Sequence, residues 1–129
     1  MLKRALLLAA ALALPSAPAV AAPADVAAAV AAPGRPAEAV ALDAVRKPAE
    51  VLSWLGLRRG DRVLDYFTGN GYYAEIIARA VGPRGSVTGW NSAGFGRNEA
   101  IRTALAGIRQ RSPNAAFYST PTTALSFAA

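Results

Sequence analysis

The middle of the chain alternates between short apolar runs and one long helical stripe. Residues 62–65 indicate a short apolar strand that ends in an acid, and residues 86–90 indicate a second strand. The apolar positions between them recur at i, i+3, i+4, i+7 and i+8, the spacing of one helical face: Tyr73, Ile76, Ile77, Ala80 and Val81. Two strands joined through a helix by short connections predict a βαβ unit with parallel strands.

Further helices and a third strand are expected around this unit. Residues 36–46 and a segment opened by Pro48 favour helices, because proline is tolerated in a first helical turn. Asn98 can cap a further helix with an apolar face, and residues 115–119 are a candidate third strand. Residues 36–129 are therefore predicted to form an α/β domain, a Rossmann-like parallel sheet of about three strands with flanking helices.

The first 21 residues have the layout of a secretory signal peptide. A basic start at residues 3–4 precedes an apolar run over residues 5–14, and Ala19-Val20-Ala21 fits an A-x-A cleavage site. The run is shorter than the roughly 20 apolar residues that a membrane span needs. We expect cleavage, a periplasmic or secreted location and no stable membrane span afterwards; the alternative is an alanine-rich disordered tail. Residues 22–35, rich in alanine and proline, are interpreted as a linker or a loosely packed arm.

The composition of the chain excludes several kinds of catalytic and metal-binding site. The chain has no cysteine and no histidine, so a thiol nucleophile, the usual zinc ligands and the commonest general base are missing, and no metal site is expected. Its 14 basic and 8 acidic residues give a net charge of +6. The basic residues are spread along the chain, and the cluster Arg58, Arg59 and Arg62 has no interleaved aromatic residues. Binding to nucleic acid is therefore not expected.

Candidate chemistry is concentrated in the turn from the first strand into the central helix. Asp65 lies at the carboxyl end of the strand, and Gly69 and Gly71 permit positive φ and a close approach of ligand to backbone. The helix directs its N-terminal N–H groups into the same crevice, as in sheets that bind a charged nucleoside ligand. The spacing Gly69-x-Gly71-x-x-Ala74 also fits the dinucleotide fingerprint, but Asn91 replaces the acid that usually binds an NAD ribose.

Residues 65–71, Asp-Tyr-Phe-Thr-Gly-Asn-Gly, resemble the D-x-G-x-G-x-G first motif of class I S-adenosylmethionine-dependent methyltransferases. The likeness extends to a bacterial branch of secreted, predicted methyltransferases in four further segments: residues 46–50, 71–75, 81–85 and 90–91. The resemblance covers residues 33–125. It implies S-adenosylmethionine as the cofactor and methyl transfer to an acceptor that the sequence does not identify.

The resemblance also implies roles for single residues. Asp65 would order the ammonium group of the cofactor's methionine part, and Asn91 would hydrogen-bond the ribose hydroxyls. Trp90 or Ser92 would flank the adenine, and Phe67 stands where the superfamily prefers glycine. The predicted cofactor-binding residues are Asp65, Phe67, Thr68, Gly69, Asn70, Gly71, Trp90 and Asn91. No catalytic residue is predicted, and the alternative role of Asp65 is a cap of the following loop or helix.

The three expected strands are fewer than class I methyltransferases use. The chain is therefore expected to hold the N-terminal half of such a domain, in a truncated form that lacks the pocket for the methyl acceptor. Two other functions stay open: an NAD-type Rossmann fragment of an oxidoreductase, and a non-enzymatic secreted remnant without a ligand. The oligomeric state is not predicted.

Processing of the N-terminus is directly testable. If the A-x-A site is used, exported protein begins at Ala22 and intact-mass analysis shows the loss of the first 21 residues. An exported protein whose mass still includes Met1 would contradict a cleavable signal.

Overall fold

The computed structural model of the protein describes residues 20–124, so nearly all of the expected signal peptide lies outside the described residues. Three parallel strands form one sheet in the order β1-β2-β3: β1 (Arg62–Tyr66), β2 (Ser86–Ser92) and β3 (Ala115–Thr120). The expected βαβ unit, its third strand and the α/β class are confirmed.

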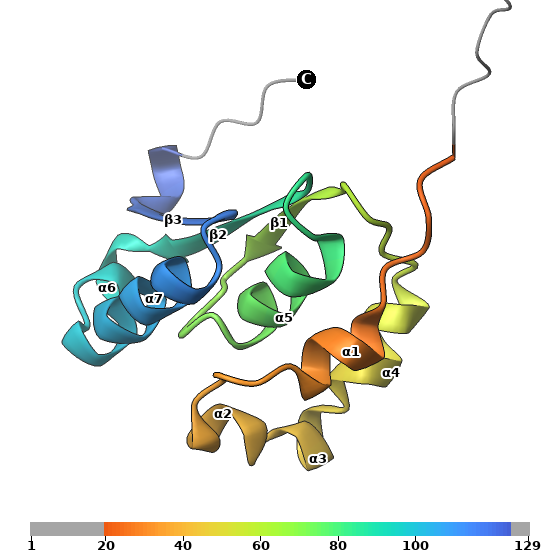
Figure 1. Cartoon of the computed structure of the whole chain (residues 1–129). Coiled ribbons are helices and arrows are strands. Elements are labelled where there is room, and N and C mark those ends of the chain that lie inside the picture. The colour runs from red at the N-terminus through yellow and green to blue at the C-terminus, as the bar shows by residue number, and fades with distance from the viewer. Residues whose placement is uncertain (1–19, 125–129) are drawn as a thin grey trace, which may run out of the picture.

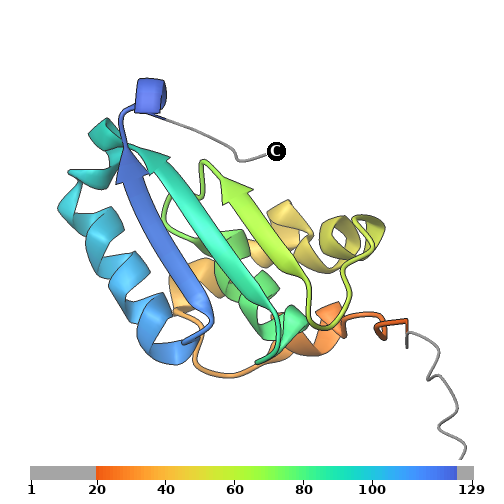
Figure 2. The same cartoon turned by 90° about the horizontal axis from the view of Figure 1, so that it is seen from above.

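Two helices return the chain between the strands: α5 (Tyr72–Val81) after β1 and α7 (Glu99–Arg111) after β2. Both lie on the same face of the sheet, and the N-terminal helices lie on that side too (Figures 1 and 2). The remaining helices are α1 (Val26–Ala31), α2 (Ala37–Val40), α3 (Asp43–Arg46), α4 (Pro48–Trp54), α6 (Ala93–Gly96) and a 3-10 turn, Thr122–Ala124. The expected helix over residues 36–46 is thus two short helices. No helix in residues 20–124 is both long and apolar enough to cross a membrane.

Helix α5 is buried on more sides than a single apolar stripe predicts. Ala74, Ile76, Ala78 and Val81 are all at most 1% exposed. The sheet covers one side of the helix, and α1 packs against another. Small alanine side chains let these neighbours approach closely, which gives the dense packing of a protein core.

The interpretation of residues 22–35 as a linker or loosely packed arm is wrong for its central part. Residues 26–31 form α1, whose Val26 and Ala29 are each 5% exposed and belong to the core. The helix begins at an N-cap, because the Asp25 carboxylate accepts a hydrogen bond from the Ala28 N–H (2.9 Å). Its alanines are small enough to pack against α5, and their uniform apolar pattern gives no periodic contrast in the sequence.

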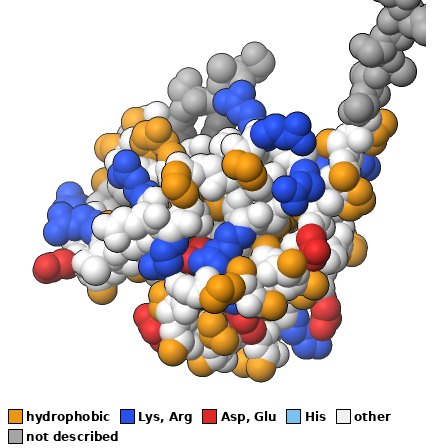
Figure 3. Space-filling view, viewed as in Figure 1, with side chains coloured by type: hydrophobic (Ala, Val, Ile, Leu, Met, Phe, Trp, Pro, Cys, Tyr) orange, Lys and Arg blue, Asp and Glu red, His pale blue; other side chains and the backbone are white. Residues whose placement is uncertain are grey.

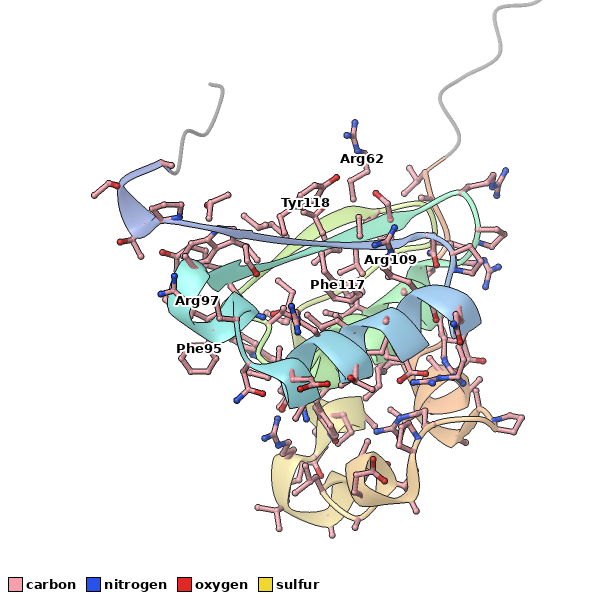
Figure 4. The ribbon with its side chains drawn as sticks, turned by 90° about the vertical axis from the view of Figure 1, so that its left-hand side faces the viewer. Arg62, Phe95, Arg97, Arg109, Phe117 and Tyr118 are labelled. Atoms are coloured by element: carbon pink, nitrogen blue, oxygen red, sulfur yellow. The ribbon has the colours of Figure 1, made fainter. Side chains whose placement is uncertain are left out.

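The opposite face of the sheet is not covered by any helix of the described part. Arg62 and Tyr118 project from this face, whereas Phe117 points toward α7 (Figure 4). Leu64 and Tyr66 share the face of Arg62, because side chains alternate along a strand, and they are 48% and 50% exposed. Residues 20–124 therefore form two layers, a sheet and one layer of helices.

Gly71, at the start of α5, is predicted to tolerate no side chain. A Cβ there would overlap Ile108 Cδ1 and approach Leu105 Cδ2 to 2.9 Å, at a φ of +84°. Gly71→Ala is expected to lower the free energy of unfolding by roughly 2–5 kcal/mol, from backbone strain plus overpacking. Gly69→Ala is the matched control, since its φ is +59° but no atom lies within 4 Å of the added Cβ; its cost is about 1–2 kcal/mol. Equal losses in urea unfolding would contradict this packing.

Candidate functional site

The loop of residues 67–71 crosses the carboxyl end of β2 on its way from β1 to α5. Tyr66, the last residue of β1, pairs with Trp90 of β2. The Thr68 N–H extends this pairing by donating to the Trp90 carbonyl oxygen (3.0 Å). The loop is therefore fixed against β2, and it meets Asn91 at the edge of the sheet where the sequence predicts a crevice.

Asp65 lies half-buried at the end of β1, beside the start of α5. Its Oδ2 accepts a hydrogen bond from the Thr68 hydroxyl (2.7 Å). Burial raises the pKa of the Asp65 carboxyl, and the Thr68 hydroxyl and the backbone of Ala74 offset part of that rise. The carboxylate thus binds within its own loop and also places a negative charge at the carboxyl end of β1.

The loop has left-handed backbone at three of its five residues. The φ angles are 60° at Phe67, 59° at Gly69 and 84° at Gly71. Glycine adopts this region freely, whereas a side chain there costs roughly 1–2 kcal/mol. An ideal Cβ on Gly69 would meet nothing within 4 Å, so the loop backbone borders open space at this point. Asn70 is exposed, and Gly71 instead faces the core.

The Asn91 side chain contacts the loop, whereas the resemblance implies a contact with the ribose of the cofactor. Its Oδ1 accepts from the Gly69 N–H (2.9 Å), and its Nδ2 donates to the Gly69 carbonyl oxygen (2.9 Å). Asn91 is 1% exposed. The amide is therefore bound to the loop and offers little surface to a ligand.

Trp90 is also covered. It is 4% exposed, and its Nε1–H donates to Thr120 Oγ1 (2.8 Å). The Tyr66 ring stacks on it at a centroid distance of 4.8 Å, and the Phe67 ring meets it edge-on at 5.0 Å. Trp90 therefore has little surface free to flank an adenine. The Phe67 ring is part of this aromatic cluster, whereas the Phe67 backbone is part of the loop.

A cavity of about 310 Å³ lies behind the loop, between α2, α5 and α7. Asn70 and Gly71 line it, together with Thr103, Glu75 and Arg111. Of the predicted cofactor-binding residues, Asn70 and Gly71 line this cavity, whereas Asp65, Gly69 and Asn91 do not.

An ion network around the buried Glu75 lies behind the loop, and the sequence pattern does not reveal it as a whole. Glu75 of α5 is 3% exposed and accepts hydrogen bonds from Arg79 (2.7 Å) and from Arg111 of α7 (2.8 and 3.0 Å). Burial alone would raise the pKa of Glu75, but the hydrogen bonds from Arg111 and Arg79 outweigh it and hold the pKa below its usual value. The i,i+4 spacing of Glu75 and Arg79 is a signal that could have shown half of this network; no local pattern indicates Arg111.

Charges elsewhere do not form one dominant patch on the face shown in Figure 3. Lys and Arg side chains are dispersed over this face, and acidic side chains lie among them, mainly in its lower half. Within residues 20–124, no group of three potential metal ligands is close enough to hold a metal ion.

Comparison with known proteins gives one family and several structural neighbours. Residues 26–103 match the family profile described as protein-L-isoaspartate(D-aspartate) O-methyltransferase. A protein-L-isoaspartate O-methyltransferase of Ignicoccus hospitalis is 58% identical over 31 residues, which are 24% of this chain and 15% of that protein.

Among solved structures, the chain is similar to a SAM-dependent methyltransferase from Aquifex aeolicus, with 26% identity and a TM-score of 0.45 over 56% of this chain and 37% of the other. It is also similar to a cyclopropane-fatty-acyl-phospholipid synthase-like protein from Lactobacillus casei, with 19% identity and a TM-score of 0.52 over 73% of this chain and 37% of the other. The latter likeness concerns the fold alone. The chain spans less than half the length of each of these proteins.

The family match lies over the elements that build the site, from α1 through both strands to the first turns of α7. Because it covers more than half of the sequence, the chain belongs to the protein-L-isoaspartate(D-aspartate) O-methyltransferase family.

Proposed function

We propose that the chain binds S-adenosylmethionine at the carboxyl ends of β1 and β2 and forms the cofactor-binding part of a methyltransferase. The observation that carries this proposal is the half-buried Asp65 carboxylate beside a glycine loop whose backbone at Gly69 borders open space. The O-methyltransferase family to which the chain belongs indicates S-adenosylmethionine as the cofactor.

The residues at this edge of the sheet fit such a cofactor. Asp65 would bind the ammonium group of the methionine part, because a carboxylate in a half-buried site attracts a cation strongly. Gly69 admits the ligand to the loop backbone, since a Cβ there would occupy space that is open. When bound, S-adenosylmethionine supplies an electrophilic methyl group. The residues described here bind and orient it, and transfer needs an acceptor held in line with that group.

The alternatives differ in how well they suit this crevice. An NAD-type function is not favoured, because the Asp65 carboxylate would repel a pyrophosphate close to the glycine loop. The family description makes an isoaspartyl carboxylate the first methyl acceptor to test. Export to the periplasm or beyond remains a proposal that the sequence of residues 1–21 supports.

Asp65 provides the direct test of this function. We predict that S-adenosylhomocysteine binds more tightly than NAD in calorimetry, and that Asp65→Asn weakens its binding roughly 10- to 150-fold, the contribution of one hydrogen bond to a charged group. NAD binding more tightly would contradict the proposal. So would unchanged S-adenosylhomocysteine affinity in a folded Asp65→Asn variant.

The pH dependence of S-adenosylhomocysteine affinity gives a second test of the role of the Asp65 carboxylate. Because burial raises the pKa of Asp65, S-adenosylhomocysteine affinity should fall with decreasing pH before an ordinary aspartate would be protonated. The melting temperature of Asp65→Asn should not fall at neutral pH. Folding raises this carboxyl pKa, so the ionised group opposes folding there, and its removal relieves a desolvation cost.

Substitutions at Phe67 test whether the loop binds the ligand through its left-handed backbone and not through this side chain. Phe67→Gly and Phe67→Ala both remove a ring that is 49% exposed, but only glycine relieves the φ of 60°. The glycine variant should therefore be more stable than the alanine variant by about 1–2 kcal/mol, the reverse of the usual order, while both retain S-adenosylhomocysteine binding. Denaturant unfolding of the pair checks the prediction, and a more stable alanine variant would refute the left-handed conformation.

A further inference from the structure

Asn91 and Gly69 lie 22 positions apart in the sequence, yet one side chain binds both polar backbone groups of the other residue. The Asn91 Oδ1 accepts from the Gly69 N–H and the Nδ2 donates to the Gly69 carbonyl oxygen, each at 2.9 Å. With 1% exposure, Asn91 presents almost no surface to the crevice. The side chain is thus placed to hold the loop.

The contact requires an amide. An ionised aspartate of the same shape only accepts hydrogen bonds, so it would leave the Gly69 carbonyl oxygen without a donor and next to a negative charge. Packing does not replace this contact, because no atom lies within 4 Å of a Cβ position on Gly69. The neighbouring bond from the Thr68 N–H to the Trp90 carbonyl oxygen fixes the loop one residue earlier. The Gly71 N–H also donates to the Thr68 carbonyl oxygen (2.9 Å), a bond within the loop. Asn91 therefore supplies, from outside the loop, the hydrogen bonds to both polar backbone groups of Gly69.

We infer that Asn91 is a positioning residue, which holds the glycine loop in its ligand-admitting conformation and does not bind the ribose of the ligand. The inference rests on the proposed function, because the loop is the part that would admit the cofactor. The two roles predict opposite effects of Asn91→Asp on ligand affinity. A carboxylate at position 91 would improve contact with ribose hydroxyls, but it loses the hydrogen bond to the Gly69 carbonyl oxygen.

Amide hydrogen exchange on the unliganded chain tests the positioning role without any ligand. The Gly69 N–H should exchange slowly in the wild type, and about tenfold faster or more in Asn91→Ala, after correction for the intrinsic rate. An aspartate at this position could still accept from the Gly69 N–H, so the alanine variant carries this test. Unchanged exchange in Asn91→Ala would overturn the inference.

Ligand affinity then separates the two roles of Asn91. We expect Asn91→Asp to weaken S-adenosylhomocysteine binding about tenfold or more at pH 8, compared with the wild type at the same pH. Tighter binding would establish the ribose role and overturn the inference. Asn98→Asp is the matched control: it adds the same charge, and aspartate caps α7 as well as asparagine, whose Oδ1 accepts from the Ile101 N–H (3.1 Å). This control should change neither measurement.

Two further outcomes also decide whether Asn91 holds the loop: a wild-type chain that binds no ligand, and position-91 variants that do not fold. A wild-type chain that binds no S-adenosylhomocysteine would contradict the proposed function, while Gly69 exchange would still show whether Asn91 holds the loop. If the position-91 variants do not fold, exchange in the wild type decides by itself: slow exchange of the Gly69 N–H and the Asn91 side-chain amide supports the contact, and fast exchange of both refutes it.

Discussion

The left-handed turn at Gly71 is the constraint on which the site depends. It ends the loop from β1 and starts α5, and its missing side chain lets Leu105 and Ile108 of α7 pack directly against the start of that helix. One position therefore sets both how the loop enters α5 and how closely α7 packs against it.

Buried charges hold the layer of helices behind this turn. Glu75 connects α5 to Arg111 of α7, and Arg79 donates to the Pro33 carbonyl oxygen (2.8 Å) in the N-terminal segment. Glu75 is the buried member of this network, and the Arg111 side chain is 31% exposed; removing either arginine would leave the buried carboxylate less compensated. The network thus makes the N-terminal segment, which the sequence suggests is a loose arm, part of the folded unit.

A second network ties the same segment to the first residue of α5. The Arg35 guanidinium, 1% exposed in its side chain, makes two 2.8 Å hydrogen bonds to the Asp43 carboxylate, which also accepts from the Tyr72 hydroxyl (2.6 Å). Burial, together with the contact to Asp43, raises the pKa of Tyr72 to about 12, so the hydroxyl stays protonated and keeps donating. The back of the loop is consequently rigid, while its front at Gly69 borders open space.

The sequence predicts the elements of this fold better than it predicts the contacts of the site. Strands β1 to β3, α5 and α7 were predictable, because their apolar spacing and their bounding turns are local patterns. Helix α1 was not, since a segment of alanine and valine has no polar face to reveal its period. Asn91 was recognised as a polar strand end, but its partner lies 22 residues away, and no local pattern shows which hydrogen bond it makes. The burial of Trp90 under neighbouring rings is likewise a product of strand pairing.

We propose that the edge of the sheet formed by β1, the glycine loop and β2 is the cofactor site. Titration of the isotope-labelled chain with S-adenosylhomocysteine, followed through its backbone amide resonances, locates the bound ligand on the chain. Shift changes should be concentrated in residues 65–71 and 89–92. Changes concentrated instead at Thr103, Gly107 and Arg111, which line the cavity between α2, α5 and α7, or no changes at all, would contradict it.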